Sequence, residues 1–160
     1  MKTLLYSEIS KYGITATIDV SSNINAPDDG CDEYLEWEDK NKKTPWLSNR
    51  KTIFQCKATN LSPKQCEFEL LIRNSNSPKL KPRIENIVKN DGEYILFTTQ
   101  SCNLTMKDQR VNHFHNTIQS AGFTNFNKTN IKVFGADEIA DWTNQYIKAV
   151  IQVQKYCGMT

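Results

Sequence analysis

Two short segments of the chain combine residue types that can hold a divalent metal ion next to a lysine. Residues 28–32 read DDGCD and supply carboxylates where a loop meets a strand. Farther along, TIFQCKAT alternates so that Gln55, Lys57 and Thr59 share one face of a strand. A carboxylate from Asp32 and an oxygen ligand from the neighbouring strand could hold the ion, with the Lys57 ammonium beside its bound water. The pattern predicts metal-assisted phosphodiester cleavage, because the ion lowers the pKa of water and the lysine orients the nucleophile or stabilises the transition state.

The same residues have a purely structural interpretation. Gln55, Lys57 and Thr59 would then form the solvated side of an edge strand, where a lysine protects against aggregation. The acidic segment upstream, with a strand on its far side, favours the metal site over this alternative.

The elements that must position these residues follow from the periodicity of the sequence. Three neighbouring strands and a later alternation of strands with helices predict an α/β fold with a mixed central sheet and helices on both faces. Helices are expected at 2–11, 62–74, 82–90, 105–121 and 136–151, and strands at 14–20, 31–37, 52–59, 92–100 and 131–135.

Composition limits the class of protein. A length of 160 residues predicts one domain over 1–160. The formal net charge of +2 gives no general sign of a nucleic-acid partner, so any basic surface must be local. Five widely spaced cysteines offer neither a disulfide framework nor a zinc knuckle. No apolar run approaches the roughly 20 residues of a membrane span, and no signal peptide is evident, so we expect a cytoplasmic protein that does not contact a membrane.

On its two central segments the chain resembles the Mrr-like branch of the PD-(D/E)xK nucleases. In that family an Asp-Gly-Gly-hydrophobic-Asp segment precedes a strand reading Gln-x-Lys, and here Asp29 replaces the first of the two glycines. The segment GADEIADWTNQY at 135–146 is similar to the closing segment of many such domains. The matching residues in the two central segments are Asp28, Gly30 and Asp32, then Phe54, Gln55, Lys57 and Ala58.

The resemblance implies a restriction-endonuclease-like fold and a set of roles. Asp32 would be the metal ligand, Gln55 would stand where most relatives have a second acid, the carbonyl of Cys56 would complete the ligand set, and Lys57 would be the catalytic lysine. Many members supply a further acid from the first helix, which would be Glu8; the alternative is a solvated glutamate. Asp28 and Asp29 would bind metal or shape the turn.

The implied cofactor is Mg²⁺, for which Mn²⁺ can substitute. Because Gln55 removes a negative charge from the ligand set, we expect weak metal binding, with activity that needs millimolar Mg²⁺ or prefers Mn²⁺.

Two basic clusters could contact the phosphates of DNA. Residues 40–51, KNKKTPWLSNRK, contain a tryptophan in a polar loop that could stack on bases, and Lys79, Lys81 and Arg83 form a second cluster. Either could equally be an ordinary solubilising surface. The residues predicted to bind DNA are Lys42, Lys43, Trp46, Arg50 and Lys51, with Thr59 beside the motif.

The two central segments predict a metal-dependent endonuclease that cuts double-stranded DNA with low sequence specificity, and the resemblance implies that it is the effector of an antiphage defence system. The resemblance implies a fused sensor or oligomerisation domain, similar to a STAND NTPase, and a homo-oligomer as the active form. The alternatives are a non-catalytic nuclease-fold module that binds nucleic acid or protein, and a DNA repair nuclease of the same fold.

Overall fold

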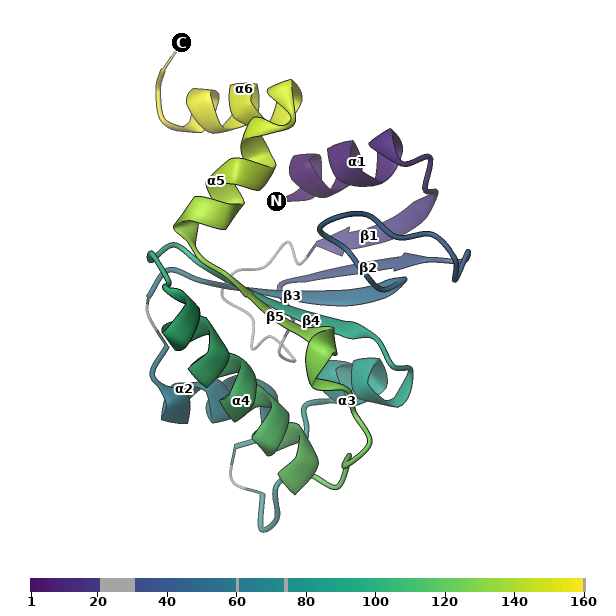
Figure 1. Cartoon of the computed structure of the whole chain (residues 1–160), viewed down its shortest axis with the longest axis vertical. Helices are drawn as coiled ribbons and strands as arrows, with labels where there is room; N and C mark the ends of the chain where they lie inside the picture. Colours follow the sequence, from purple (N-terminus) through teal and green to yellow (C-terminus); the bar gives the residue numbers. More distant parts are fainter. Residues whose placement is uncertain (21–30, 60, 74, 160) are drawn as a thin grey trace.

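The computed structural model describes residues 1–20, 31–59, 61–73 and 75–159. In chain order its helices and strands are α1 (Lys2–Lys11), β1 (Ala16–Val20), β2 (Glu33–Trp37), β3 (Lys51–Lys57), α2 (Pro63–Leu70), α3 (Pro82–Lys89), β4 (Glu93–Thr98), α4 (Leu104–Ser120), the 3₁₀ helix η1 (Lys128–Asn130), β5 (Ile131–Phe134), α5 (Ala136–Asn144) and α6 (Ile147–Tyr156). From α1 to β5 they follow one another as the periodicity predicted, with a short 3₁₀ helix added before β5 (Figure 1).

The five strands form one mixed sheet in the order β1-β2-β3-β4-β5. β1 pairs with β2 and β2 with β3 in antiparallel fashion, whereas β3, β4 and β5 are parallel. Parallel neighbours need a crossover. Here α2 and α3 connect β3 to β4, and α4 connects β4 to β5.

Helices cover both faces of the sheet, which confirms the predicted α/β class (Figure 1). α2, α3 and α4 lie on one face, with a core that includes Ile53 of β3 and Phe114 of α4. α1, α5 and α6 lie on the other face, where Phe54 of β3 packs with Trp142 of α5. No helix in the described part of the chain has the length and apolar composition needed to cross a bilayer.

The predicted strands were one or two residues too long at several ends, and three predicted helix boundaries were wrong. α2 ends at Leu70 and not at residue 74. Beyond it the chain is extended, and the Ile72 amide donates to the Lys79 carbonyl (2.9 Å) in place of a helical hydrogen bond. α4 begins at Leu104, because the Asn103 side chain caps it by accepting from the Met106 amide (2.9 Å).

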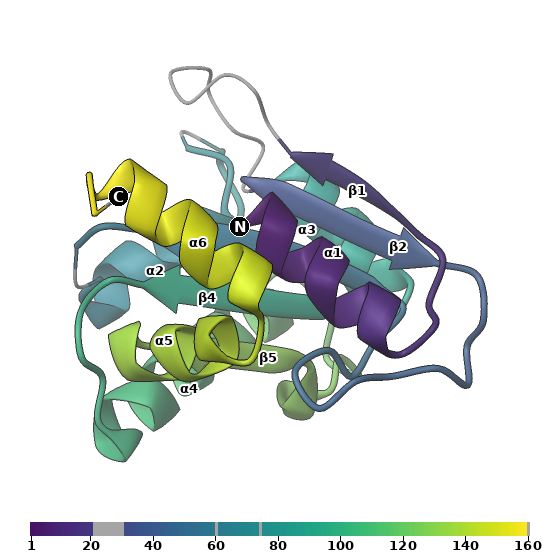
Figure 2. The ribbon, with the colours of Figure 1, turned by 90° about the horizontal axis from the view of Figure 1, so that it is seen from above.

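The third difference is the closing helix, expected over 136–151, which is two helices. Trp142 Nε1 and the Tyr146 hydroxyl both donate to Glu8 Oε2, at 2.7 and 2.5 Å. Tyr146 has extended backbone angles, so the chain turns there and α6 runs beside α1 (Figure 2). The contacts of Glu8 in α1 with Trp142 and Tyr146 therefore accompany the break between α5 and α6.

A buried ion pair holds the loop between β2 and β3 against the sheet. Glu93 at the start of β4 is fully buried and pairs with Lys132 of β5 at 2.6 Å. Its carboxylate also accepts from the Ser48 hydroxyl at 2.9 Å, and Lys132 donates to the Trp46 carbonyl at 3.2 Å. These contacts satisfy a charge that would be costly to bury alone.

Candidate active site

The candidate site lies where β2 and β3 part. The pairing of β2 with β3 ends at Glu33 opposite Phe54, whereas β3 continues beside β4 as far as Lys57 opposite Thr98. The last residues of β3 therefore have β4 on one side and the start of β2, with Asp32 just before it, on the other.

Asp32 bridges this opening. Its amide donates to the Phe54 carbonyl (2.9 Å), while its Oδ2 accepts from the Cys56 amide (2.5 Å) and from Gln55 Nε2 (3.2 Å). Because the N–H and C=O of a strand residue point to the same side, the Cys56 carbonyl also faces Asp32. The structure thus brings together Asp32, Gln55 and the Cys56 backbone, 23 and 24 residues apart along the chain.

Lys57 lies on the same sheet face as Gln55, toward α2, α3 and α4. Its Nζ pairs with Glu69 Oε2 of α2 at 2.8 Å, and both side chains are largely shielded from solvent. Gln55 itself is fully buried under this layer, so the interpretation of this face as the solvated side of an edge strand was wrong for Gln55. Thr59 follows the end of β3 and is exposed.

Glu69 was missed in the sequence. It occupies the same helix face as the buried Cys66, three residues earlier, and it precedes the buried Leu70. An acid on the inward side of a predicted amphipathic helix is the signal that could have identified it. Its carboxylate pairs with the ammonium of Lys57, which follows Gln55 by two residues on the same sheet face.

Glu33 is a second missed acid, next to Asp32 but on the opposite face of the sheet. It is only 6% exposed, and within the described residues its Oε2 has no hydrogen-bond donor. Burial raises its pKa to about 7, against the opposing Met1 ammonium, and the Asp32 carboxylate adds to the rise. The alternation that buries Leu35 and Trp37 in β2 also places Glu33 on the core face.

Glu8 does not lie with these residues. It is fully buried between α1, α5 and α6, on the sheet face opposite Gln55 and Lys57, and it accepts from Trp142 and Tyr146. The alternative of a solvated glutamate was wrong. In this structure its role is to join the first helix to the last two.

The residues around Asp32 include oxygen donors of the kind that Mg²⁺ takes in proteins. Asp32 supplies a carboxylate and the Cys56 carbonyl a neutral oxygen, the donors that hard cations prefer. Gln55 turns its Nε2 toward Asp32, so its amide would have to rotate by about 180° to offer Oε1 to an ion. Among the described residues no group of three or more His, Cys, Asp or Glu side chains could hold a metal. Asp28, Asp29 and Gly30 lie outside the described residues. One carboxylate with two neutral oxygens leaves an ion several water ligands, as is usual for Mg²⁺.

The basic loop predicted to bind DNA lies far from this cluster. Lys51 begins β3 and Lys57 ends it, so the two lie about 20 Å apart along the strand. Figure 2 shows the loop beyond the far end of β2, at the opposite end of the sheet from the β4 arrowhead. Of the loop residues, Lys51 pairs with Glu36 at 3.1 Å, and Lys43 is exposed. The structure does not bring this loop to Asp32.

Three further residues of this loop are partly buried or hydrogen-bonded within the fold. Trp46 is half-buried and stacks on Trp142, with ring centroids 5.2 Å apart, and Arg50 is also half-buried. Lys42 Nζ donates to the Gly13 carbonyl at 2.5 Å.

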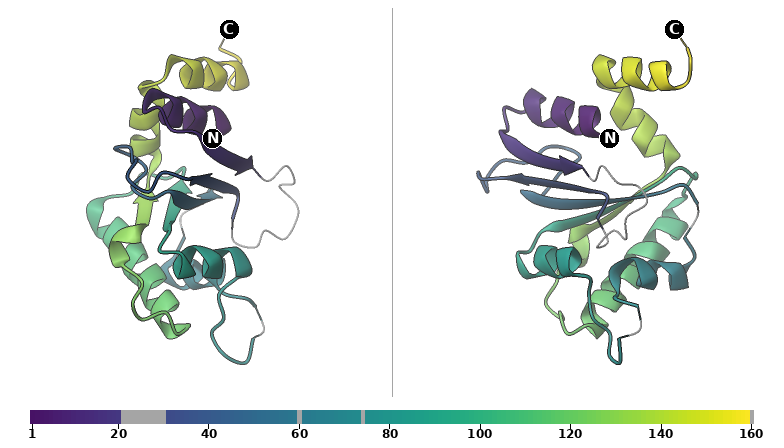
Figure 3. Two further views of the ribbon diagram at one scale, coloured as in Figure 1. Left: turned by 90° about the vertical axis from the view of Figure 1, so that its right-hand side faces the viewer. Right: turned by 180° about the vertical axis from the view of Figure 1, so that it is seen from behind.

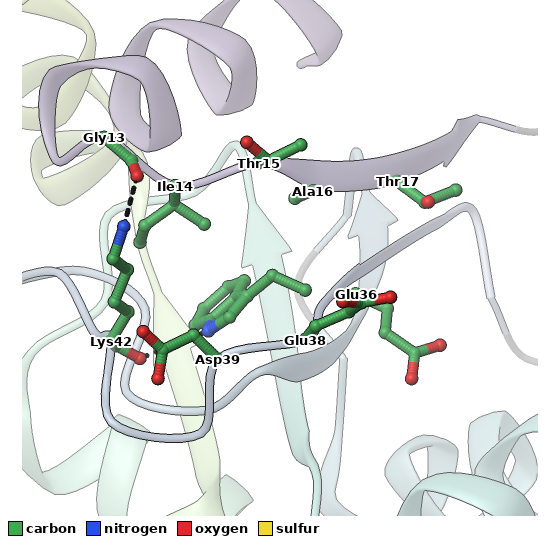
Figure 4. A pocket seen from close by; sticks show the side chains of 10 residues that line it. Gly13, Ile14, Thr15, Ala16, Thr17, Glu36, Glu38, Asp39 and Lys42 are labelled. Carbon is green, nitrogen blue, oxygen red and sulfur yellow. Dashed lines mark hydrogen bonds between the residues drawn. The ribbon is translucent and has the colours of Figure 1, made fainter.

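A pocket of about 600 Å³ lies beside this lysine, between residues 13–17 and 36–42 (Figure 4). The charged side chains lining it are the acids Glu36, Glu38 and Asp39, with Lys42 as the cation. Hydrogen bonding from Tyr34 and pairing with Lys51 hold the pKa of Glu36 below its ordinary value. The ionised acids disfavour an anionic ligand such as a phosphate in this pocket.

Comparison of the chain with protein-family models, with curated proteins and with solved structures finds no match.

Proposed function

We propose that this chain is a metal-dependent endonuclease domain with a restriction-endonuclease-like fold. The observation that carries the proposal is the contact of the Asp32 carboxylate with both Gln55 and the Cys56 backbone, two residues or fewer before Lys57. The mixed sheet supports it, because β2 and β3 diverge at the residues that the chemistry requires.

The residues divide the chemistry among them. Asp32, Gln55 and the Cys56 carbonyl would hold Mg²⁺ or Mn²⁺, which when bound lowers the pKa of a water and neutralises charge on a phosphate. The Lys57 ammonium would orient the attacking water or stabilise the pentavalent transition state. Glu69 fixes the direction of Lys57 at a distance of 2.8 Å. With a neutral glutamine in the ligand set, activity needs millimolar Mg²⁺ or prefers Mn²⁺.

The substrate in this proposal is double-stranded DNA, cut with low sequence specificity in the cytoplasm. We further propose that the domain is an antiphage effector, held inactive until a fused sensor similar to a STAND NTPase clusters it into a homo-oligomer. This part rests on the resemblance of the two central segments alone. A repair nuclease of the same fold would use the same site on a different DNA structure.

A non-catalytic binding module is the second candidate. Two observations favour it: Gln55 is neutral and fully buried, and Lys57 and Glu69 satisfy each other's charge. In such a module Asp32 would serve only to cap the exposed edge of β3.

Cleavage of supercoiled plasmid, measured beside duplex binding, separates the two candidates. The variant Lys57→Ala removes the proposed catalytic cation, and Lys64→Ala removes an exposed lysine of α2 as the matched control. An enzyme loses cleavage but keeps binding in Lys57→Ala, and keeps both in Lys64→Ala. Absence of cleavage by the wild-type chain in Mg²⁺ and Mn²⁺, even when it is fused to a forced oligomer, would establish the binding module instead.

A further inference from the structure

A second basic cluster lies at the same end of the sheet as Asp32. Residues 79–83, here called the basic segment, lead into α3 and carry Lys79, Lys81 and Arg83. Lys79 and Arg83 are exposed, and Lys81 is half-buried. Lys79 and Lys81 flank the buried Leu80, so alternation directs both away from the core.

Two contacts fix the basic segment against the two sides of the candidate site. On one side Arg83 Nη1 lies 3.9 Å from Cys31 Sγ, and Cys31 directly precedes Asp32. On the other side the Lys81 amide donates to the Leu70 carbonyl at 2.8 Å, and Leu70 directly follows Glu69, the partner of Lys57. Figure 3 shows α3 and the loop before it on the sheet face covered by α2 and α4.

Among the residues that the structure describes, the ion pairs of Asp19 and Glu85 leave the basic segment a positive surface. Arg83 meets Asp19 at 3.8 Å, but both side chains are about half exposed or more. Such exposed pairs contribute little free energy, so a phosphate can replace Asp19. Glu85 pairs with Lys89 at 2.5 Å on its own helix, so its charge is compensated there.

We propose that the basic segment, and not the loop at 40–51, is the surface that binds the phosphate backbone of substrate DNA beside the site. The proposal rests on the proposed nuclease function for its partner. A duplex carries one negative charge per roughly 1.7 Å of its axis, so cations at the border of the site hold it where Lys57 can reach a phosphate. The distant loop has Glu36, Glu38 and Asp39 beside its lysines and lies about 20 Å along β3 from Lys57.

The test compares two variants that each remove three positive charges. In one, Lys79, Lys81 and Arg83 are changed to Ala; in the control, Lys40, Lys42 and Lys43 are changed to Ala. Binding of a fluorescein-labelled duplex is followed by anisotropy in EDTA over a series of salt concentrations, and thermal melting verifies that each variant is folded. If the triple variant does not fold, the single variant Arg83→Gln is measured in the same binding assay instead.

The proposal predicts that the basic-segment variant binds at least about tenfold more weakly at low salt and that its log–log salt slope is smaller by about 2 to 3. The control should change affinity by no more than about threefold, through long-range electrostatics alone. An equal or larger loss in the control would overturn the proposal. If the wild type cleaves plasmid while the basic-segment variant binds normally, this inference fails and the nuclease proposal stands. If the wild type binds through the basic segment but cleaves nothing, even when it is fused to a forced oligomer, the nuclease proposal fails and this surface stands. If the wild type neither binds duplex nor, when fused to a forced oligomer, cleaves plasmid, both fail.

Discussion

Replacing Glu33 by glutamine should stabilise the chain in a pH-dependent way. In the folded protein burial raises the pKa of Glu33 from 4.5 to about 7. Between these values the folded chain keeps a proton that the unfolded chain releases, so the wild type loses stability as the pH rises through this window. Glutamine has no proton to lose, and the variant therefore escapes this loss.

The magnitude follows from the pKa difference. A difference of about 2.5 between the folded and unfolded chains, at about 1.4 kcal/mol per pKa unit, corresponds to about 3 kcal/mol. The full amount applies near pH 8, and about 1 kcal/mol applies near pH 5, where only part of the window has been crossed. Any packing or hydrogen-bond cost of the amide is the same at both pH values, so the change of about 2 kcal/mol between them identifies the titration.

Urea unfolding followed by tryptophan fluorescence, in EDTA near pH 5 and pH 8, measures this change. The exposed glutamate Glu38, changed to glutamine, is the matched control and should show the same difference from wild type at both pH values. The reasoning is refuted if Glu33→Gln follows the wild-type pH profile, or if its advantage is larger at the lower pH.

Three further changes test other parts of the structure. Lys132→Met should cost about 3 kcal/mol in urea unfolding, because it leaves Glu93 as a buried unpaired charge; a cost below about 1 kcal/mol would contradict a stabilising role of the pair. Glu8→Ala should cost about 2–4 kcal/mol and speed hydrogen exchange first in α6, since it removes the acceptor of two buried donors; uniform exchange across the fold would argue against that role. Glu69→Gln should slow plasmid cleavage about tenfold without weakening DNA binding, because Lys57 loses its charged partner; an unchanged rate would remove Glu69 from the site.

The sequence predicted the elements well where local patterns decide them. Residues 92–100 read as a strand from their aromatic and branched side chains, and every residue of β4 is buried. Ser62 with Pro63 predicted the start of α2, because proline suits the first turn of a helix. Ile84, Ile87 and Val88 predicted α3 by their helical spacing, and all three are buried. The mixed sheet with helices on both faces followed from the order of these elements. The restriction-endonuclease-like identity of that sheet stays a prediction.

Tertiary contacts decided what local patterns could not. The break at Tyr146 depends on Glu8, 138 residues earlier, and no local signal marks it. Gln55 was expected on a solvated or reactive face, and its complete burial depends on the helices packed over that face. By contrast, the distance between the loop at 40–51 and Lys57 could have been predicted from the sequence. The loop lies at the start of the predicted strand, whereas Lys57 lies near its end.

The central claim is that Asp32, Gln55 and the Cys56 carbonyl hold a divalent ion that serves cleavage. Its most direct test is plasmid cleavage by the wild type, Asp32→Asn and Gln55→Glu over a titration of Mg²⁺. We predict that Asp32→Asn is inactive and that Gln55→Glu, which adds a carboxylate, reaches half its maximal rate at a lower Mg²⁺ concentration than the wild type. Cleavage by Asp32→Asn at the wild-type rate, or wild-type cleavage that persists in EDTA, would contradict the claim.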